Sequence, residues 1–262
     1  MRNRTGLSSA ETASFDGARR LGDGRGPATA ESASRLAGVG MAALVAALSA
    51  GCALMVVFRP YLTGSHLYFL FLIWNLFLAW LPYAATAGAL LCLGALSPSP
   101  VRTALVAAFG ALWLLFLPNA AYLATDFIHL VANQDHYVNE GIFGYMLWYD
   151  LVMLFLFSWC GVFLGFLSTY PFHRLIAERA GGAAGWAFVA VVSALCGYGI
   201  FLGRIVRLNS WDALVRPGVL IDEIMGNLHV RGALFSLLFA AFTAITYVFL
   251  YALRKNGRTR PR

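Results

Sequence analysis

The stretch Trp-Leu-Leu-Phe-Leu-Pro-Asn-Ala-Ala-Tyr-Leu-Ala-Thr-Asp-Phe-Ile-His-Leu, residues 113–130, places a polar pattern directly after a hydrophobic helix. An apolar run leads into Pro118. Polar side chains then recur at alternating intervals of three and four residues: Asn119, Tyr122, Asp126, His129, Asn133 and His136. This spacing puts them on one face of a helix. We therefore expect a membrane span that ends at Pro118, followed by an interfacial amphipathic helix with Asn119 as its N-cap.

The composition of the chain indicates an integral membrane protein. Of its 262 residues, 60% are hydrophobic and only 12% are charged, whereas soluble domains carry about 25% charged residues. The apolar residues also form runs of about 20 or more, which is the length that crosses a bilayer. We therefore expect an all-α, polytopic helical bundle that forms one transmembrane domain and contacts the lipid bilayer.

Six apolar runs are expected to span the membrane, at about residues 36–58, 67–96, 101–117, 143–167, 183–202 and 231–253. The second run is interpreted as one helix kinked at Pro82, because about thirty residues at 1.5 Å each are too few for two crossings and a turn. Residues 1–35 are rich in small and charged side chains and are expected to form a disordered cytoplasmic tail. Residues 254–262 form a basic tail.

The positive charges predict how the chain is oriented. The formal net charge is +7, and every basic residue except Lys255 is an arginine. These residues concentrate in the tails and short loops, which is typical of charges that fix membrane topology, so we expect no nucleic-acid partner. With six spans most of them share a side with both tails, and we therefore expect cytoplasmic termini. A seven-span arrangement ranks second because it would place the basic C-terminal tail outside.

The first candidate site follows from the opening stretch. In the six-span arrangement it lies at the outer membrane interface. Asp126 and His129 share a helix face, which suits either a general base oriented by a carboxylate or two ligands for a divalent metal. Asn119 and Tyr122 are predicted to bind substrate beside them. The alternative is an amphipathic helix whose polar face simply meets water.

The second candidate is Asp150, in Met-Leu-Trp-Tyr-Asp at residues 146–150. A carboxylate costs about 2.5–3.5 kcal/mol at the centre of a bilayer and less near its edge, so this one should face the interior and have a partner. We predict a catalytic carboxylate. The alternative is a structural ion pair with an arginine.

The third candidate is the sequence Gly-Arg-Ile-Val-Arg-Leu-Asn-Ser-Trp-Asp at residues 203–212. Its two arginines are one turn apart, and a pair of guanidinium groups suits a phosphate or a carboxylate. Asn209 and Asp212 are spaced as a helix cap and its reciprocal partner. Internal pairing of the arginines with nearby aspartates is the alternative. The residues predicted to bind substrate here are Arg204, Arg207, Asn209, Trp211 and Asp212.

These three blocks together resemble a bacterial integral membrane family catalogued as domain of unknown function 1361. The resemblance rests on residues 116–130, Trp-Tyr-Asp at 148–150 and residues 203–212, and it covers roughly residues 65–250. The first block of that family usually has proline where this chain has Ala121, and a proline there would lie in the first turn of the following helix. The resemblance implies a location in the bacterial inner membrane and supplies no activity.

We expect the outer cluster to form an acid–base or metal-dependent site that acts on a lipid-linked or anionic substrate. Catalytic motifs of high specificity, such as HExxH, GxSxG or a P-loop, do not occur in the sequence. One alternative is a transporter with Asn75, Asp150 and Arg204 along its path, although the cytoplasmic half has few polar residues. The other is a structural or partner-binding membrane protein without catalysis. The sequence indicates no particular protein partner.

Overall fold

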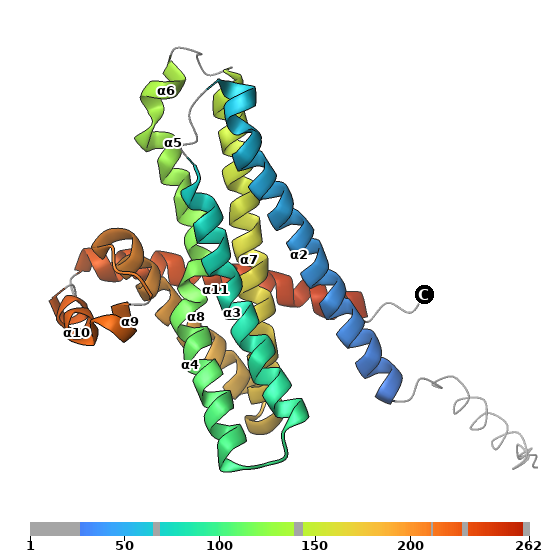
Figure 1. Cartoon of the computed structure of the whole chain (residues 1–262). Coiled ribbons are helices and arrows are strands. Elements are labelled where there is room, and N and C mark those ends of the chain that lie inside the picture. The colour runs from blue at the N-terminus through green and yellow to red at the C-terminus, as the bar shows by residue number, and fades with distance from the viewer. Residues whose placement is uncertain (1–26, 65–68, 139–143, 211, 227–229, 259–262) are drawn as a thin grey trace, which may run out of the picture. The chain divides into compact units, whose positions relative to one another are not determined.

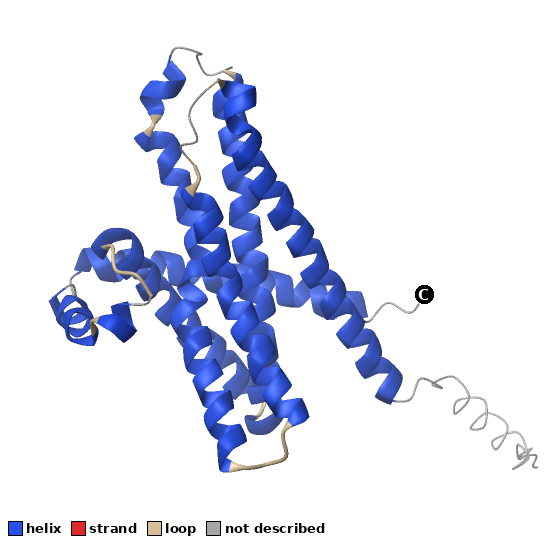
Figure 2. Ribbon diagram, in the orientation of Figure 1, coloured by secondary structure: helices blue, strands red, loops and turns tan. Residues whose placement is uncertain are grey.

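The computed structural model describes residues 27–64, 69–138, 144–210, 212–226 and 230–258. The chain divides into two units, Met1–Leu44 and Val45–Arg262. The first unit contributes only the beginning of the first helix to the described residues, and the second contains the helix bundle and the site. These described residues form helices and turns and contain no strand (Figure 2).

The long helices are α2 (Pro27–Thr63), α3 (Phe71–Ala95), α4 (Pro100–Tyr122), α7 (Tyr145–Ala180), α8 (Gly182–Phe201) and α11 (Val230–Arg258), as Figure 1 shows. The short elements are the 3-10 turn η1 (Leu123–Phe127), α5 (Ile128–Ala132), α6 (Gln134–Val138), the π-helical turn η2 (Leu202–Val206), α9 (Asp212–Val215) and α10 (Pro217–Gly226).

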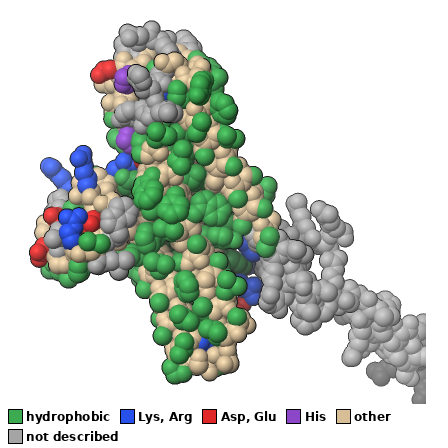
Figure 3. Space-filling view, in the orientation of Figure 1, with side chains coloured by type: hydrophobic (Ala, Val, Ile, Leu, Met, Phe, Trp, Pro, Cys, Tyr) green, Lys and Arg blue, Asp and Glu red, His purple; other side chains and the backbone are tan. Residues whose placement is uncertain are grey.

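The prediction of six membrane-spanning helices is confirmed. Six helical segments of the described chain are long and apolar enough to cross a membrane: Val39–Thr63, Phe71–Ala95, Pro100–Ala132, Tyr145–Ala180, Gly182–Val206 and Val230–Asn256. Hydrophobic side chains cover most of the face seen in Figure 3, whereas most charged ones on that face gather over α9 and α10. An apolar exterior of this kind is stable in lipid rather than in water.

Helix α4 packs against α3, α7 and α8. Helices α8 and α11 pack antiparallel, because Trp186 near the start of α8 contacts Tyr251 near the end of α11, while Phe201 at the end of α8 contacts Phe235. Helix α8 thus packs against both α11 and α7.

Two glycines let α7 and α8 approach the last turns of α4. A Cβ atom on Gly161 of α7 would lie 2.0 Å from the carbonyl oxygen of Ala120. A Cβ atom on Gly199 of α8 would lie 2.4 Å from the ring of Pro118. Small residues allow this close backbone approach, so the segment that leads into the site is held from two sides.

Pro118 does not end its helix, contrary to the sequence-based prediction. Helix α4 continues to Tyr122 and passes into η1 and α5. The proline removes one main-chain hydrogen bond, but a helix end at this point would leave several more main-chain groups without partners. The Asn119 side chain donates to the Phe116 carbonyl oxygen over 3.0 Å and caps no new helix. Ala121 therefore lies in the last turn of α4.

Two other helices extend beyond their predicted limits. Helix α2 begins at Pro27, earlier than the predicted start at Leu36, and the preceding part of the expected tail lies outside the described residues. Helix α7 continues through Pro171, where a loop was expected, and ends at Ala180. Gly181 follows it, with a φ of 93° that suits glycine. At the other end of the chain, α11 extends to Arg258.

The second predicted span is a single helix, as expected. Helix α3 contains Pro82 in its interior. The hydroxyl of Thr86 donates to the Pro82 carbonyl oxygen over 3.0 Å and to the Ser168 carbonyl oxygen over 2.9 Å. A threonine hydroxyl in a helix often donates to the carbonyl oxygen four residues earlier, and here the same hydroxyl also connects α3 to α7.

Candidate functional site

The first polar cluster is centred on the carboxylate of Asp126. This side chain lies in η1, is 0% exposed and forms an ion pair with Arg204 of η2. The side-chain amide of Asn75 on α3 donates to its second oxygen over 3.2 Å. Three elements far apart in the sequence therefore meet at one carboxylate, as a buried charge requires.

Arg204 is oriented by several partners. Its Nε atom donates to the hydroxyl of Thr125 over 2.8 Å, and its Nη2 atom donates to Thr125 and to Asp126. Its Cζ atom lies 4.2 Å from the centroid of the Tyr122 ring, a cation–π contact. The side chain is 18% exposed. Among the described residues Nη1 has no hydrogen-bond partner, so this nitrogen is available to a ligand.

His129 lies beside the same carboxylate. Its Nε2 atom is 3.9 Å from Asp126 Oδ1, and its ring centroid is 4.6 Å from that of Phe71. The separation is longer than a hydrogen bond. The structure thus brings the two residues of the predicted pair together, with the imidazole 22% exposed and the carboxylate buried.

A cavity of about 230 Å³ adjoins this cluster, between α3, the end of α4 and the segment that ends α8. It is several times the roughly 30 Å³ that one water occupies in the liquid. Its wall contains the ring of Tyr122 on which Arg204 is stacked. The Asn119 amide donates to Ser210 Oγ over 2.9 Å across this wall. The polar residues that line it are Asn75, Asn119, Tyr122, Asn209 and Ser210.

Arg207 has an unusual backbone conformation at the end of η2. Its φ is 66°, in the left-handed region, and its N–H donates to the Leu202 carbonyl oxygen. This conformation costs a residue other than glycine roughly 1–2 kcal/mol, and single π-turns occur frequently at functional sites. The side chain is exposed, and it forms no ion pair with any residue in the described part of the chain.

Asp150 belongs to a second cluster. Its two oxygens accept hydrogen bonds from Arg59 Nε and Nη2 over 2.6 and 2.7 Å. The hydroxyl of Tyr137 donates to Oδ2 over 2.8 Å. All three side chains are buried. Burial, together with the hydrogen bond to Asp150, raises the pKa of the Tyr137 hydroxyl. Asp150 and Asp126 accept hydrogen bonds from different residues, so the two carboxylates belong to separate clusters.

The carboxylate of Asp212 holds the segment after η2. The Asn209 backbone N–H donates to Asp212 Oδ2 over 2.7 Å, which is one half of the expected capping arrangement. Arg216 donates to Oδ1 over 3.0 Å. The hydrogen bond from the Asn209 N–H, and to a smaller extent the one from Arg216, lower the pKa of Asp212. Trp211, predicted as a substrate-binding residue, lies outside the described residues.

The structure adds four residues that the sequence analysis did not include in the site: Arg59, Thr125, Tyr137 and Ser210. For Arg59 a signal was available. It ends the first apolar run on the side of the bundle where the fourth span begins, so a six-span arrangement places it level with Asp150. The other three are neutral residues whose type and spacing carry no such signal.

A divalent metal would need ligands beyond Asp126 and His129. Among the described residues no group of three His, Cys, Asp or Glu side chains is arranged to hold a metal ion. Both oxygens of Asp126 already accept hydrogen bonds from Arg204 and Asn75. A metal would have to displace one of these donors. The arrangement therefore suits anion binding and proton transfer better than metal coordination.

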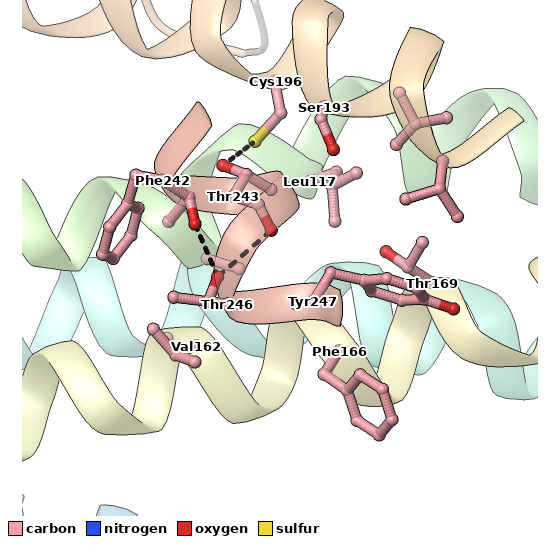
Figure 4. Close-up of a pocket in the computed structure, with 16 residues that line it drawn as sticks. Leu117, Val162, Phe166, Thr169, Ser193, Cys196, Phe242, Thr243, Thr246 and Tyr247 are labelled. Atoms are coloured by element: carbon pink, nitrogen blue, oxygen red, sulfur yellow. Dashed lines mark hydrogen bonds between the residues drawn. The ribbon is translucent and has the colours of Figure 1, made fainter. Parts of the chain in front are cut away.

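A smaller cavity, of about 30 Å³, lies between α4, α7, α8 and α11 (Figure 4). The hydroxyl of Thr243 donates to Cys196 Sγ over 3.9 Å at its edge. Thr246 donates to the Phe242 carbonyl oxygen over 2.8 Å. This volume corresponds to about one water molecule, so the cavity is too small for a substrate.

Comparison with known families gives one match. A family model described as "Protein of unknown function (DUF1361)" matches residues 74–246. The matched region contains Asp126, Asp150 and Arg204 together with the whole lining of the larger polar cavity, whereas Arg59 precedes it. No curated protein and no solved structure matches the chain.

Proposed function

Because the chain belongs to DUF1361, a family without an assigned activity, we propose a function from the site itself: the polar cavity binds the anionic headgroup of a lipid-linked substrate at the outer face of the membrane. One observation carries this proposal. A cavity of about 230 Å³ has five polar lining residues, among them Tyr122, on whose ring Arg204 is stacked. Leu208, which follows Arg207, also lines it, and of these two arginines only Arg204 has an acidic partner among the described residues.

The charge balance of the cluster favours an anion. Asp126 neutralises Arg204, and Arg207 leaves one positive charge without a counterpart in the described chain. A phosphate or carboxylate group would complete the balance and accept hydrogen bonds from both guanidinium groups. The side-chain amide of Asn209 lines the same cavity and offers a further donor.

The position of the cavity favours a substrate carried by lipid. It lies where α3 begins and where α4 and α8 end, and lipid headgroups surround the ends of membrane-spanning helices. The concentration of arginine in the two tails supports cytoplasmic termini, and with six spans the cavity then faces outward. In that orientation it would meet headgroups of the outer leaflet.

Acid–base chemistry at His129 is a second candidate function. The 3.9 Å separation between His129 Nε2 and Asp126 Oδ1 favours it, because catalytic hydrogen bonds often shorten only when substrate binds. Asp126 would orient the imidazole, and His129 would accept a proton from the substrate or from water. Metal analysis of the purified protein separates this from metal-dependent chemistry: stoichiometric metal that is lost in both Asp126→Ala and His129→Ala would support coordination.

The headgroup proposal is tested by ligand-dependent thermal stability. The Tm of the full chain in detergent is measured against inorganic phosphate at constant ionic strength, and separately against phosphatidylglycerol. A ligand that binds the folded state raises Tm saturably. A saturable rise in Tm with either ligand supports the site. A rise with phosphatidylglycerol alone would indicate that the phosphate must be carried by lipid.

The decisive variant is Arg207→Gly. Glycine accepts the left-handed conformation, so we expect no loss of stability without ligand. Loss of a charged hydrogen bond of about 1.5–3 kcal/mol should weaken binding about tenfold or more. Arg216→Gln, which removes an exposed arginine paired with Asp212, should bind as the wild type does. Equal binding by wild type and Arg207→Gly, or no effect of either ligand, would refute the proposal.

A further inference from the structure

An apolar groove of about 680 Å³ runs between α7 and α11, with one end beside η1. Its walls consist mainly of aromatic and aliphatic side chains. On α11 its residues extend from Leu238 to Leu250, which is about 18 Å at 1.5 Å per residue. One leaflet contributes about 15 Å of hydrocarbon to a bilayer. The groove is therefore about as long as one leaflet is thick. Because it lies between two membrane-spanning helices, lipid rather than water is its natural solvent.

Arg254 lies one helical turn beyond Leu250, on the ridge formed by Phe242, Thr246 and Leu250 at intervals of four residues. Its Cζ atom lies 4.3 Å from the centroid of the Tyr170 ring on α7. Its Nε atom is buried and has no hydrogen-bond partner, and the guanidinium forms no ion pair with any described residue. A buried donor of this kind normally has an acceptor.

Arg254 lies near the end of the apolar segment Val230–Asn256. It stands among large aromatic side chains with polar atoms: Tyr170 contacts Tyr251 with ring centroids 6.2 Å apart, and Tyr251 contacts Trp186 with centroids 5.0 Å apart. Tyr and Trp concentrate at membrane–water interfaces. The apolar groove thus leads along α11 toward a cation near the end of that helix.

We propose that the groove and Arg254 bind one anionic phospholipid, with an acyl chain in the groove between α7 and α11 and the phosphate on the guanidinium of Arg254. The groove supplies an apolar surface of suitable length, and Arg254 supplies a charge that the described chain does not neutralise. The phosphate would accept hydrogen bonds from the Nη groups of the half-buried Arg254 side chain. This site lies apart from the polar cavity and does not depend on the function proposed for it.

Native mass spectrometry of the full chain released from detergent tests this proposal. The probes are dioleoylphosphatidylglycerol and dioleoylglycerol, which share their acyl chains and differ in the phosphate-bearing headgroup. In the Arg207→Gly background, in which phosphatidylglycerol binding at the polar cavity is expected to be weakened, we expect the phospholipid to be retained more tightly than the diacylglycerol. Equal retention of the two lipids would refute a role for the phosphate.

Two pairs of variants locate the lipid. Arg254→Gln should weaken phosphatidylglycerol binding about tenfold or more, as expected for loss of a charged hydrogen bond, while Lys255→Gln removes the neighbouring exposed charge and should not. Ile245→Trp fills the groove at a position that is 67% exposed. Val248→Trp alters a 47% exposed position that does not line the groove. Ile245→Trp should weaken phosphatidylglycerol binding, whereas Val248→Trp should not. If the two variants of either pair change phosphatidylglycerol binding equally, the site is refuted.

Discussion

At the scale of single residues, the pair formed by Arg59 and Asp150 is the strongest candidate for a purely structural role. Removing one member of a buried ion pair leaves an uncompensated charge, which costs about 3–5 kcal/mol. We therefore expect Asp150→Asn to lower the free energy of unfolding by that amount in detergent titrations. Asp135→Asn, at an exposed position on α6, should change it by less than about 0.5 kcal/mol. Similar losses in the two variants would contradict the structural role.

The carboxylate of Asp212 should make stability depend on pH. Its pKa in the folded protein lies below the usual value, so its contribution is complete above the unfolded-state pKa of about 3.9 and is lost as the pH falls through the lower folded-state pKa. We expect Asp212→Asn to have a lower Tm than the wild type near neutral pH and the difference to shrink below about pH 4. For Asp222→Asn, at an exposed position on α10, the difference should stay constant. A constant difference for Asp212→Asn as well would rule out this linkage.

Residue chemistry predicted part of the site. Charged groups in apolar surroundings need partners, which is why Asp126 and Arg204 could be selected from the sequence and prove to be paired. The partner of Asp150 is 91 positions away in the sequence, and no local periodicity indicates such a contact. The hydroxyl groups of Thr125 and Tyr137 contribute through geometry that only the folded chain provides.

At the scale of elements, the approach of α7 to α4 depends on Gly161. A methyl group there would meet the Ala120 carbonyl oxygen at 2.0 Å, whereas one on Gly165 would be 3.8 Å from the nearest side-chain atom. Overpacking of this kind typically costs about 1–3 kcal/mol. We expect Gly161→Ala to lose that much stability in a detergent unfolding titration and Gly165→Ala to lose none. Equal stability of the two variants would show that the helices can separate without cost.

The number of membrane-spanning helices was predictable from the sequence, but the residues at which they begin and end were not. Long apolar runs identify a span regardless of its neighbours, so six helices follow from the sequence. Pro118 and Pro171 suggest ends that the chain does not have, because in a bilayer one missing hydrogen bond costs less than a broken helix. The ring of Pro118 also packs against Gly199, a tertiary contact that favours continuing the helix.

At the scale of the whole molecule, orientation decides which compartment the polar cavity meets. Position-specific labelling with a membrane-impermeant maleimide tests it, in a background in which the partly exposed Cys92 is replaced by alanine. Because arginine concentrates in the tails, we expect Asp135→Cys to react in intact cells and Ser97→Cys and Asn256→Cys to react only after permeabilisation. All three positions are exposed, so protection in intact cells reports the side of the membrane. The reverse pattern would place the cavity in the cytoplasm, and its ligand would then come from the inner leaflet or from solution.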